Sequence, residues 1–110
     1  MVEHEFWTYP HAFYEMKEAE TSLYKELSEK ILLVFKGDLN YRKLIADINW
    51  DFDTPFVKAL KGFTPAPLVA LRTLKADCVA GLPPGVGEEL SRENHDWMIT
   101  GEYGLIQFAQ

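Results

Sequence analysis

The sequence is poor in cysteine, in basic residues and in long apolar runs, and each shortage excludes a class of protein. The single cysteine, Cys78, cannot form a disulfide within the chain, which suits a reducing compartment. The longest apolar run, Ile31 to Phe35, has five residues, whereas a membrane-spanning helix needs about 20. No basic segment followed by an apolar one opens the chain, so no secretory signal is visible. We therefore expect a cytoplasmic protein without a membrane-spanning segment.

Basic residues are outnumbered, and most of the imbalance lies in one half of the chain. The chain holds 17 acidic and 11 basic residues, a net charge of −6. Residues 1–53 hold eleven acidic and six basic residues, a net charge of −5. Because contacts with phosphate groups normally need Lys or Arg, this distribution argues against nucleic-acid binding. It favours a basic protein partner, which an acidic surface attracts and steers.

Length and hydrophobicity indicate one domain that spans residues 1–110. A chain of 110 residues leaves no room for two ordinary domains. Hydrophobic residues make up 47% of the chain and aromatic residues 14%, enough to form a core without disulfides or a structural metal. We therefore expect no cofactor.

A long helix over residues 11–35 is the main predicted element. Apolar residues recur there at steps of three and four, the spacing of one helical face; they are Met16, Ala19, Leu23, Leu27, Ile31 and Val34. Pro10 precedes the segment and Gly37 follows it, as at helix starts and stops. The end of the segment, residues 31–35, is apolar all round and also fits a buried strand.

The rest of the chain reads as shorter elements. Helices are expected from Leu39, after Thr54-Pro55, after Thr64-Pro65 and over residues 88–94. Residues 48–52 alternate between apolar and polar side chains, as in a half-buried strand. Two β-rich runs, 97–100 and 105–108, flank a connection with two glycines and suggest a hairpin. The predicted fold class is α+β and mostly helical: a long N-terminal helix packed with two or three shorter helices and a C-terminal β-hairpin.

The N-terminal segment is dense in aromatic side chains, namely Phe6, Trp7, Tyr9, Phe13 and Tyr14. A disordered tail would have few such residues. The preferred interpretation is that the segment packs over the helix and closes the core. The alternative is an exposed aromatic anchor for a partner, because Trp and Tyr are frequent at interface hot spots.

The acidic stretch Asp47-x-Asn49-x-Asp51-x-Asp53 opens like a calcium-binding loop. It then fails, because Phe52 stands where glycine is needed and Lys58 where a bidentate Glu is needed. The solvent face of a short strand is the preferred interpretation. The three histidines lack ligand spacing, and Cys78 fits a core thiol better than a nucleophile. We assign no catalytic and no metal-binding residue.

These patterns favour a small acidic protein-binding module, such as an inhibitor or immunity protein that masks a basic partner, over an enzyme. The predicted partner-binding residues are Asp47, Trp50, Asp51, Asp53 and Trp7. One alternative is an enzyme or small-ligand binder with a pocket near the C-terminal hairpin, lined by His95, Trp97 and Tyr103. Another is a structural subunit that forms a homo-oligomer through its aromatic N-terminus.

Overall fold

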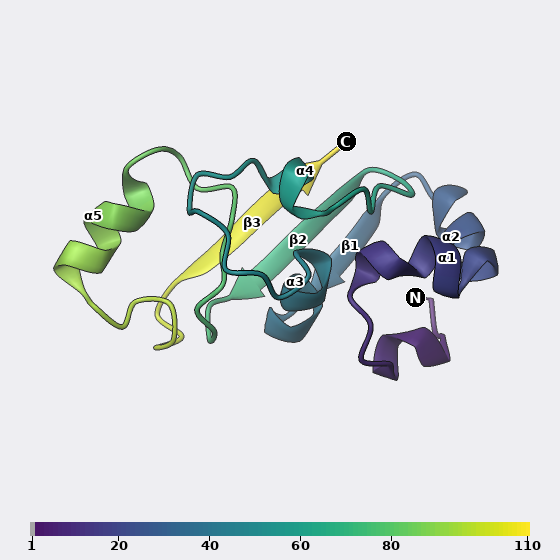
Figure 1. Cartoon of the computed structure of the whole chain (residues 1–110), viewed down its shortest axis with the longest axis horizontal. Helices are drawn as coiled ribbons and strands as arrows, with labels where there is room; N and C mark the ends of the chain where they lie inside the picture. The colour runs from purple at the N-terminus through teal and green to yellow at the C-terminus, as the bar shows by residue number, and fades with distance from the viewer. Residues whose placement is uncertain (1) are drawn as a thin grey trace.

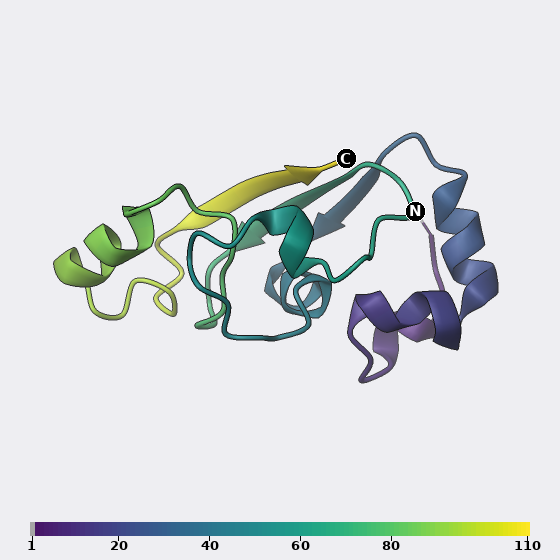
Figure 2. The same ribbon diagram turned by 45° about the horizontal axis from the view of Figure 1, so that its top comes forward.

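A three-stranded mixed sheet organises the computed structural model, which describes residues 2–110 (Figure 1). Strand β1 (Leu33–Lys36) pairs in parallel with β2 (Leu68–Thr73), and β2 pairs antiparallel with β3 (Gly104–Ala109). Helices α3 (Asp38–Leu44) and α4 (Phe56–Ala59) lie in the connection between β1 and β2, on one face of the sheet (Figure 2). The chain is thus a small α/β domain, and the prediction of a mostly helical α+β fold is wrong.

The remaining helices flank the sheet. The N-terminal ones are the 3-10 helices η1 (Glu5–Thr8) and η2 (Phe13–Glu15), then α1 (Met16–Ala19) and α2 (Thr21–Ser28). Helix α5 (Val86–Glu93) lies at the opposite end of the molecule (Figure 1). It agrees with the helix expected over residues 88–94. No helix among residues 2–110 has the length and apolar character needed to cross a membrane.

The single long N-terminal helix does not form. The backbone leaves the helical region at Glu20, where φ is −141° and ψ is 69°, and this break separates α1 from α2. Leu23 and Leu27 do face the core. Ile31 is 92% exposed and lies outside β1. The strand interpretation of residues 31–35 is therefore correct for residues 33–35, and the helix interpretation is wrong. Short helices suffice because tertiary packing of the apolar face, more than helix length, stabilises them.

Strand β2 replaces the helix predicted after Thr64-Pro65. Its side chains alternate, with Leu68, Ala70 and Arg72 buried and the residues between them more exposed. A central strand with a parallel neighbour is close to continuously apolar in sequence, which resembles a buried helix. The buried charge of Arg72 further obscures the two-residue period.

The C-terminal hairpin and the short strand over residues 48–52 are also absent from the described chain. Residues 97–100 form turns, and Trp97 packs edge-on against Phe52 and Tyr103 in a small second core. Strand β3 finds its partner in β2 instead. Residues 48–52 form no ladder; the indole of Trp50 donates a hydrogen bond to the carbonyl of Ile45 at 2.8 Å.

The N-terminal aromatic segment closes the main core. Phe6 and Phe13 are fully buried. The ring of Phe13 lies 5.4 Å from that of Phe35 on β1 and 5.6 Å from that of Phe63. The preferred prediction for this segment is confirmed, except that the aromatic side chains pack on the sheet and its connections rather than along one long helix.

Candidate functional site

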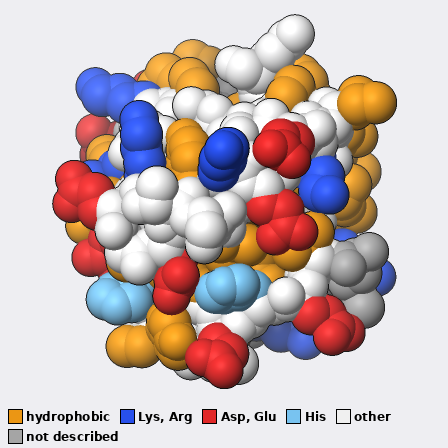
Figure 3. Space-filling model, turned by 90° about the vertical axis from the view of Figure 1, so that its right-hand side faces the viewer, with side chains coloured by type: hydrophobic (Ala, Val, Ile, Leu, Met, Phe, Trp, Pro, Cys, Tyr) orange, Lys and Arg blue, Asp and Glu red, His pale blue; other side chains and the backbone are white. Residues whose placement is uncertain are grey.

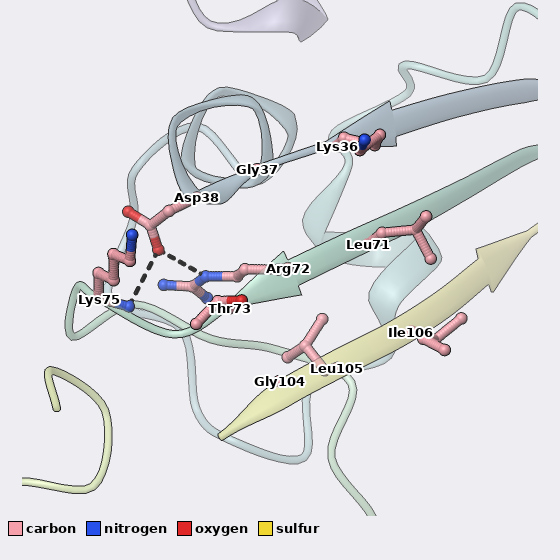
Figure 4. A pocket seen from close by; sticks show the side chains of 10 residues that line it. All are labelled: Lys36, Gly37, Asp38, Leu71, Arg72, Thr73, Lys75, Gly104, Leu105 and Ile106. Atoms are coloured by element: carbon pink, nitrogen blue, oxygen red, sulfur yellow. Dashed lines mark hydrogen bonds and ion pairs between the residues drawn. The ribbon is translucent and has the colours of Figure 1, made fainter. Parts of the chain in front are cut away.

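The parallel strands β1 and β2 end at the same edge of the sheet, and a cleft of about 770 Å³ opens there (Figure 4). In sheets with parallel strands, ligands bind outside the carboxyl ends of the strands. The cleft is lined from the end of β1, the end of β2, the loop after β2 and the start of β3, by Lys36, Gly37, Asp38, Leu71, Arg72, Thr73, Lys75, Gly104, Leu105 and Ile106. Three of these side chains are basic and one is acidic. The cleft is therefore locally positive in a chain whose net charge is −6.

Gly37 makes the sharp turn that follows β1. Its φ of 101° lies in a region that L side chains rarely adopt. This turn lets α3 begin directly after the strand, so Asp38 occupies the first helical position at the mouth of the cleft. The carboxylate of an acidic residue is favourable there because it faces the partial positive charge of the helix start.

A buried ion pair joins the end of β2 to the start of α3. Arg72 Nε donates to Asp38 Oδ1 at 2.8 Å; the arginine side chain is fully buried and that of Asp38 is 19% exposed. The guanidinium also donates to the carbonyls of Cys78 at 2.6 Å and Ala76 at 2.9 Å, and it lies 4.4 Å from the ring centre of Tyr41. Each side of the guanidinium is thus engaged by protein atoms. Arg72 is a structural centre behind the cleft rather than a group that reaches a ligand.

The same carboxylate positions Lys75. The backbone N–H of Lys75 donates to Asp38 Oδ1 at 3.3 Å. Figure 4 shows the side chains of Asp38 and Lys75 next to each other at one end of the cleft, with Lys36 on the neighbouring strand. Both lysine side chains belong to exposed residues. No hydrogen bond among residues 2–110 engages Asp38 Oδ2, so that oxygen is available to a ligand.

A second set of hydrogen bonds fixes α3 to β3 beneath the cleft. The hydroxyl of Tyr41 donates to Gln107 Oε1 at 2.6 Å and accepts from the N–H of Ala80 at 3.3 Å. Gln107 Nε2 donates to the carbonyl of Ala80 at 2.6 Å. Burial raises the pKa of Tyr41 from its ordinary value of 10.0 to about 12. These contacts span up to 66 residues of sequence separation, which is why no local pattern reveals them.

The residues predicted to bind a basic partner lie outside this cleft. Asp47 is paired with Arg42, whose guanidinium donates to both carboxylate oxygens at 3.0 Å. Hydrogen bonding to Arg42 lowers the pKa of Asp47 below its ordinary value. Asp51 and Asp53 are exposed in the loop between α3 and α4, but the strand that would align them does not exist.

The two predicted aromatic anchors are half-buried. Trp50 lies in the same loop as Asp51, whereas Trp7 on η1 packs edge-on against Phe13 and Phe35. Figure 3 views the end of the molecule that carries the N-terminal helices; acidic, basic and apolar side chains are interspersed there, without one continuous acidic face. Partner binding by these residues stays a prediction.

Cys78 is buried, and burial raises the pKa of its thiol from 9.0 to about 11. A thiol with a raised pKa is a poor nucleophile, which agrees with the expected core role. No group of three or more His, Cys, Asp or Glu side chains that could hold a metal ion occurs within residues 2–110. The side chains predicted to line the alternative pocket, His95, Trp97 and Tyr103, do not line the cleft. The start of β3, residues 104–106, lines it instead.

The sequence signals of the cleft are two short stretches that begin at the ends of β1 and β2 and continue into the residues that follow them: Lys36-Gly37-Asp38 and Arg72-Thr73-Leu74-Lys75. Basic residues and a turn glycine directly after apolar runs are informative only once the runs are recognised as parallel strands. Sequence reasoning missed the cleft because it assigned both runs to helices.

Comparison of the sequence with known proteins identifies a matching family. A model of the damage-control phosphatase ARMT1-like domain matches residues 1–90. The chain is 55% identical over 107 residues to the damage-control phosphatase ARMT1 of Xenopus tropicalis, and 50% identical over 105 residues to that of Homo sapiens. These matches cover 97% and 96% of this chain but 24% of each relative. The chain therefore spans about a quarter of the length of the curated relatives it matches.

The relatives carry the name of phosphatases, which overturns the leading functional prediction. The inhibitor or immunity-protein interpretation is wrong, and the alternative of an enzyme agrees better with the relatives. The physical reason for the error is that net charge was averaged over half the chain. The local charge of the cleft has the opposite sign.

Proposed function

Because the chain belongs to the damage-control phosphatase ARMT1-like family, we propose that it supplies the phosphate-binding edge of an enzyme that hydrolyses phosphate monoesters. The observation that carries this proposal is the cleft at the ends of β1 and β2. Asp38 and Lys75 are tied together there by one hydrogen bond, with Lys36 on the adjacent strand. The full reaction also involves the three quarters of the relatives that this chain does not match.

Each residue of the cleft has a distinct task in this proposal. Lys75 and Lys36 neutralise the phosphate oxygens, because exposed ammonium groups are compact charges with several donors. Asp38 Oδ2 accepts a hydrogen bond from a hydroxyl group of the substrate or from the attacking water. Arg72 does not contact the substrate; it holds Asp38 and the loop of Lys75 in fixed positions.

Phosphate binding can be tested on this chain directly. We expect orthophosphate, added to the ¹⁵N-labelled protein, to shift the amide signals of Gly37, Asp38 and Lys75 saturably. Lys75→Met should weaken this binding by about tenfold, the effect of losing one hydrogen bond to a charged group. Lys58→Met is the matched control, because Lys58 is an exposed lysine on α4 outside the cleft. Equal weakening by both variants, or no shifts in the cleft, would contradict the proposal.

Hydrolysis is tested in a protein of the full length of the relatives. A suitable one is the Xenopus tropicalis relative in which this chain replaces the matched 107-residue segment, assayed with p-nitrophenyl phosphate. We expect Lys75→Met to lower kcat/KM and Lys58→Met to leave it unchanged. An active chimera that is insensitive to Lys75→Met would exclude the cleft as the phosphate site.

A further inference from the structure

One face of the sheet has no helix on it. In Figure 2, α3 and α4 lie beneath the strands, and no helix among the described residues covers the upper face. The strand register places two rows of side chains on that open face: Val34, Val69 and Phe108 in one, and Lys36, Leu71 and Ile106 in the other.

The open face is strongly apolar for a surface. Val34 is 56% exposed, Ile106 is 78% exposed and Phe108 is 55% exposed. They come from the two outer strands, and Val69 and Leu71 of β2 lie between them. A contiguous apolar patch across a whole sheet, unlike scattered apolar residues, marks an interaction surface.

The strand pairing indicates what covers such a face. All-parallel sheets occur almost only where helices cover both faces, because their crossover connections carry helices, and a parallel pair such as β1-β2 is typical of that layered architecture. Here one side of the parallel pair β1-β2 has its helices and the other has none. We propose that the open face, defined by Val34, Val69, Leu71, Ile106 and Phe108, docks a layer of apolar helices formed by the part of the full-length relatives that this chain does not match.

The greater length of the relatives favours this occupant over a second copy of the chain. Their unmatched three quarters are available to form a layer, since 97% of this chain accounts for 24% of the Xenopus tropicalis protein. Two copies of a chain with a net charge of −6 would repel one another. Leu71 and Ile106 of this face also line the cleft, so the docked layer would border the proposed phosphate site. Thermal stability tests the docking without an assay of activity, so failure of the docking and failure of the proposed function are distinguishable.

The test compares Phe108→Lys with Ile99→Lys in two settings. The two wild-type side chains have nearly equal exposure, 55% and 54%, but Ile99 lies outside the open face. In the isolated chain we expect the two variants to have similar melting temperatures. In the chimera described above, we expect Phe108→Lys to melt roughly 5 °C or more below Ile99→Lys, because only Phe108 would be buried there.

A second substitution on the open face tests whether the effect of Phe108→Lys is specific to β3. Val34→Lys lies in the same row, on β1, and should repeat the result of Phe108→Lys. Equal melting of the Phe108 and Ile99 variants in the chimera would overturn the proposal. So would a chimera that fails to fold while its parent folds. Sedimentation that shows a dimer of the isolated chain, lost on Phe108→Lys, would assign the face to a second copy instead.

Discussion

The N-terminal aromatic cluster and the polar centre behind the cleft are both buried but are stabilised by different forces. The N-terminal aromatic cluster joins Phe6, Phe13, Phe35 and Phe63 through ring contacts, and these side chains carry no polar atoms. The centre behind the cleft is polar: Arg72 makes three hydrogen bonds and a cation–π contact while its side chain is fully buried. The first centre closes the core, and the second fixes the geometry of the candidate site.

This difference predicts opposite tolerance to substitution. Apolar contacts are nondirectional, so a cluster of rings tolerates a side chain of similar volume. A buried ion pair with several hydrogen bonds does not tolerate substitution, because removal of one partner leaves the remaining buried polar groups without a hydrogen bond or an opposite charge. Substitutions should therefore cost most in the polar centre and least in the aromatic cluster.

The largest effect is expected for Arg72→Met. The change keeps most of the volume but leaves the Asp38 carboxylate and two carbonyls without their donor, and breaking a buried pair in this way costs about 3–5 kcal/mol. Urea unfolding monitored by circular dichroism would measure the loss. Asp38→Asn in the same background should recover part of it, because the unpaired charge is then absent. A loss below about 1 kcal/mol would show that the pair contributes little.

Alkaline pH should weaken the polar centre through Tyr41. Burial raises the pKa of Tyr41 to about 12 from 10.0, so its contribution to stability is complete below pH 10 and is lost as the pH rises through 12. A shift of this size corresponds to a loss on the order of 2–3 kcal/mol. Urea unfolding at several pH values above 9 would measure it.

The control for this titration is Tyr41→Phe. Burial also raises the pKa of Cys78 from 9.0 to about 11. Deprotonation of that thiol therefore also destabilises the fold as the pH rises. The Phe variant retains the thiol and removes the phenol, so it should lose stability more gradually above pH 10. Identical pH profiles for the variant and the parent would contradict the role given to Tyr41.

The contrast between the centres also explains how much could be predicted from the sequence. The aromatic core was predictable because Phe6 and Phe13 are large, apolar and close in sequence. Exposing such side chains to water is costly, so burial in the core is the expected arrangement. Helix α3 was predictable from Asp38 and the apolar spacing after it, and α5 from the acidic residues Glu88 and Glu89 in its first turn. Each of these signals lies within a few residues.

The sheet and the candidate site were not predictable in this way. Strands β1 and β2 pair across more than thirty residues, and a short apolar run does not distinguish a buried strand from a helix segment. Arg72 was unremarkable in sequence, since only the fold brings Asp38 within 2.8 Å of it. The negative net charge of the chain then concealed the basic cleft, because net charge carries no information about where charged side chains lie in the fold.

The smallest effect is expected in the aromatic cluster, for Phe13→Leu. Phe13 is fully buried, and its ring lies 5.3 Å from that of Trp7 and 5.4 Å from that of Phe35. Leucine keeps the apolar character and loses the ring contacts, so we expect a cost of about 1–1.5 kcal/mol. No ionisable group is altered, so the cost should be the same at pH 7 and pH 10 and at low and high salt. Urea unfolding under these four conditions measures it. A cost above about 3 kcal/mol, or one that varies with pH, would show that the aromatic cluster and the polar centre respond as one unit.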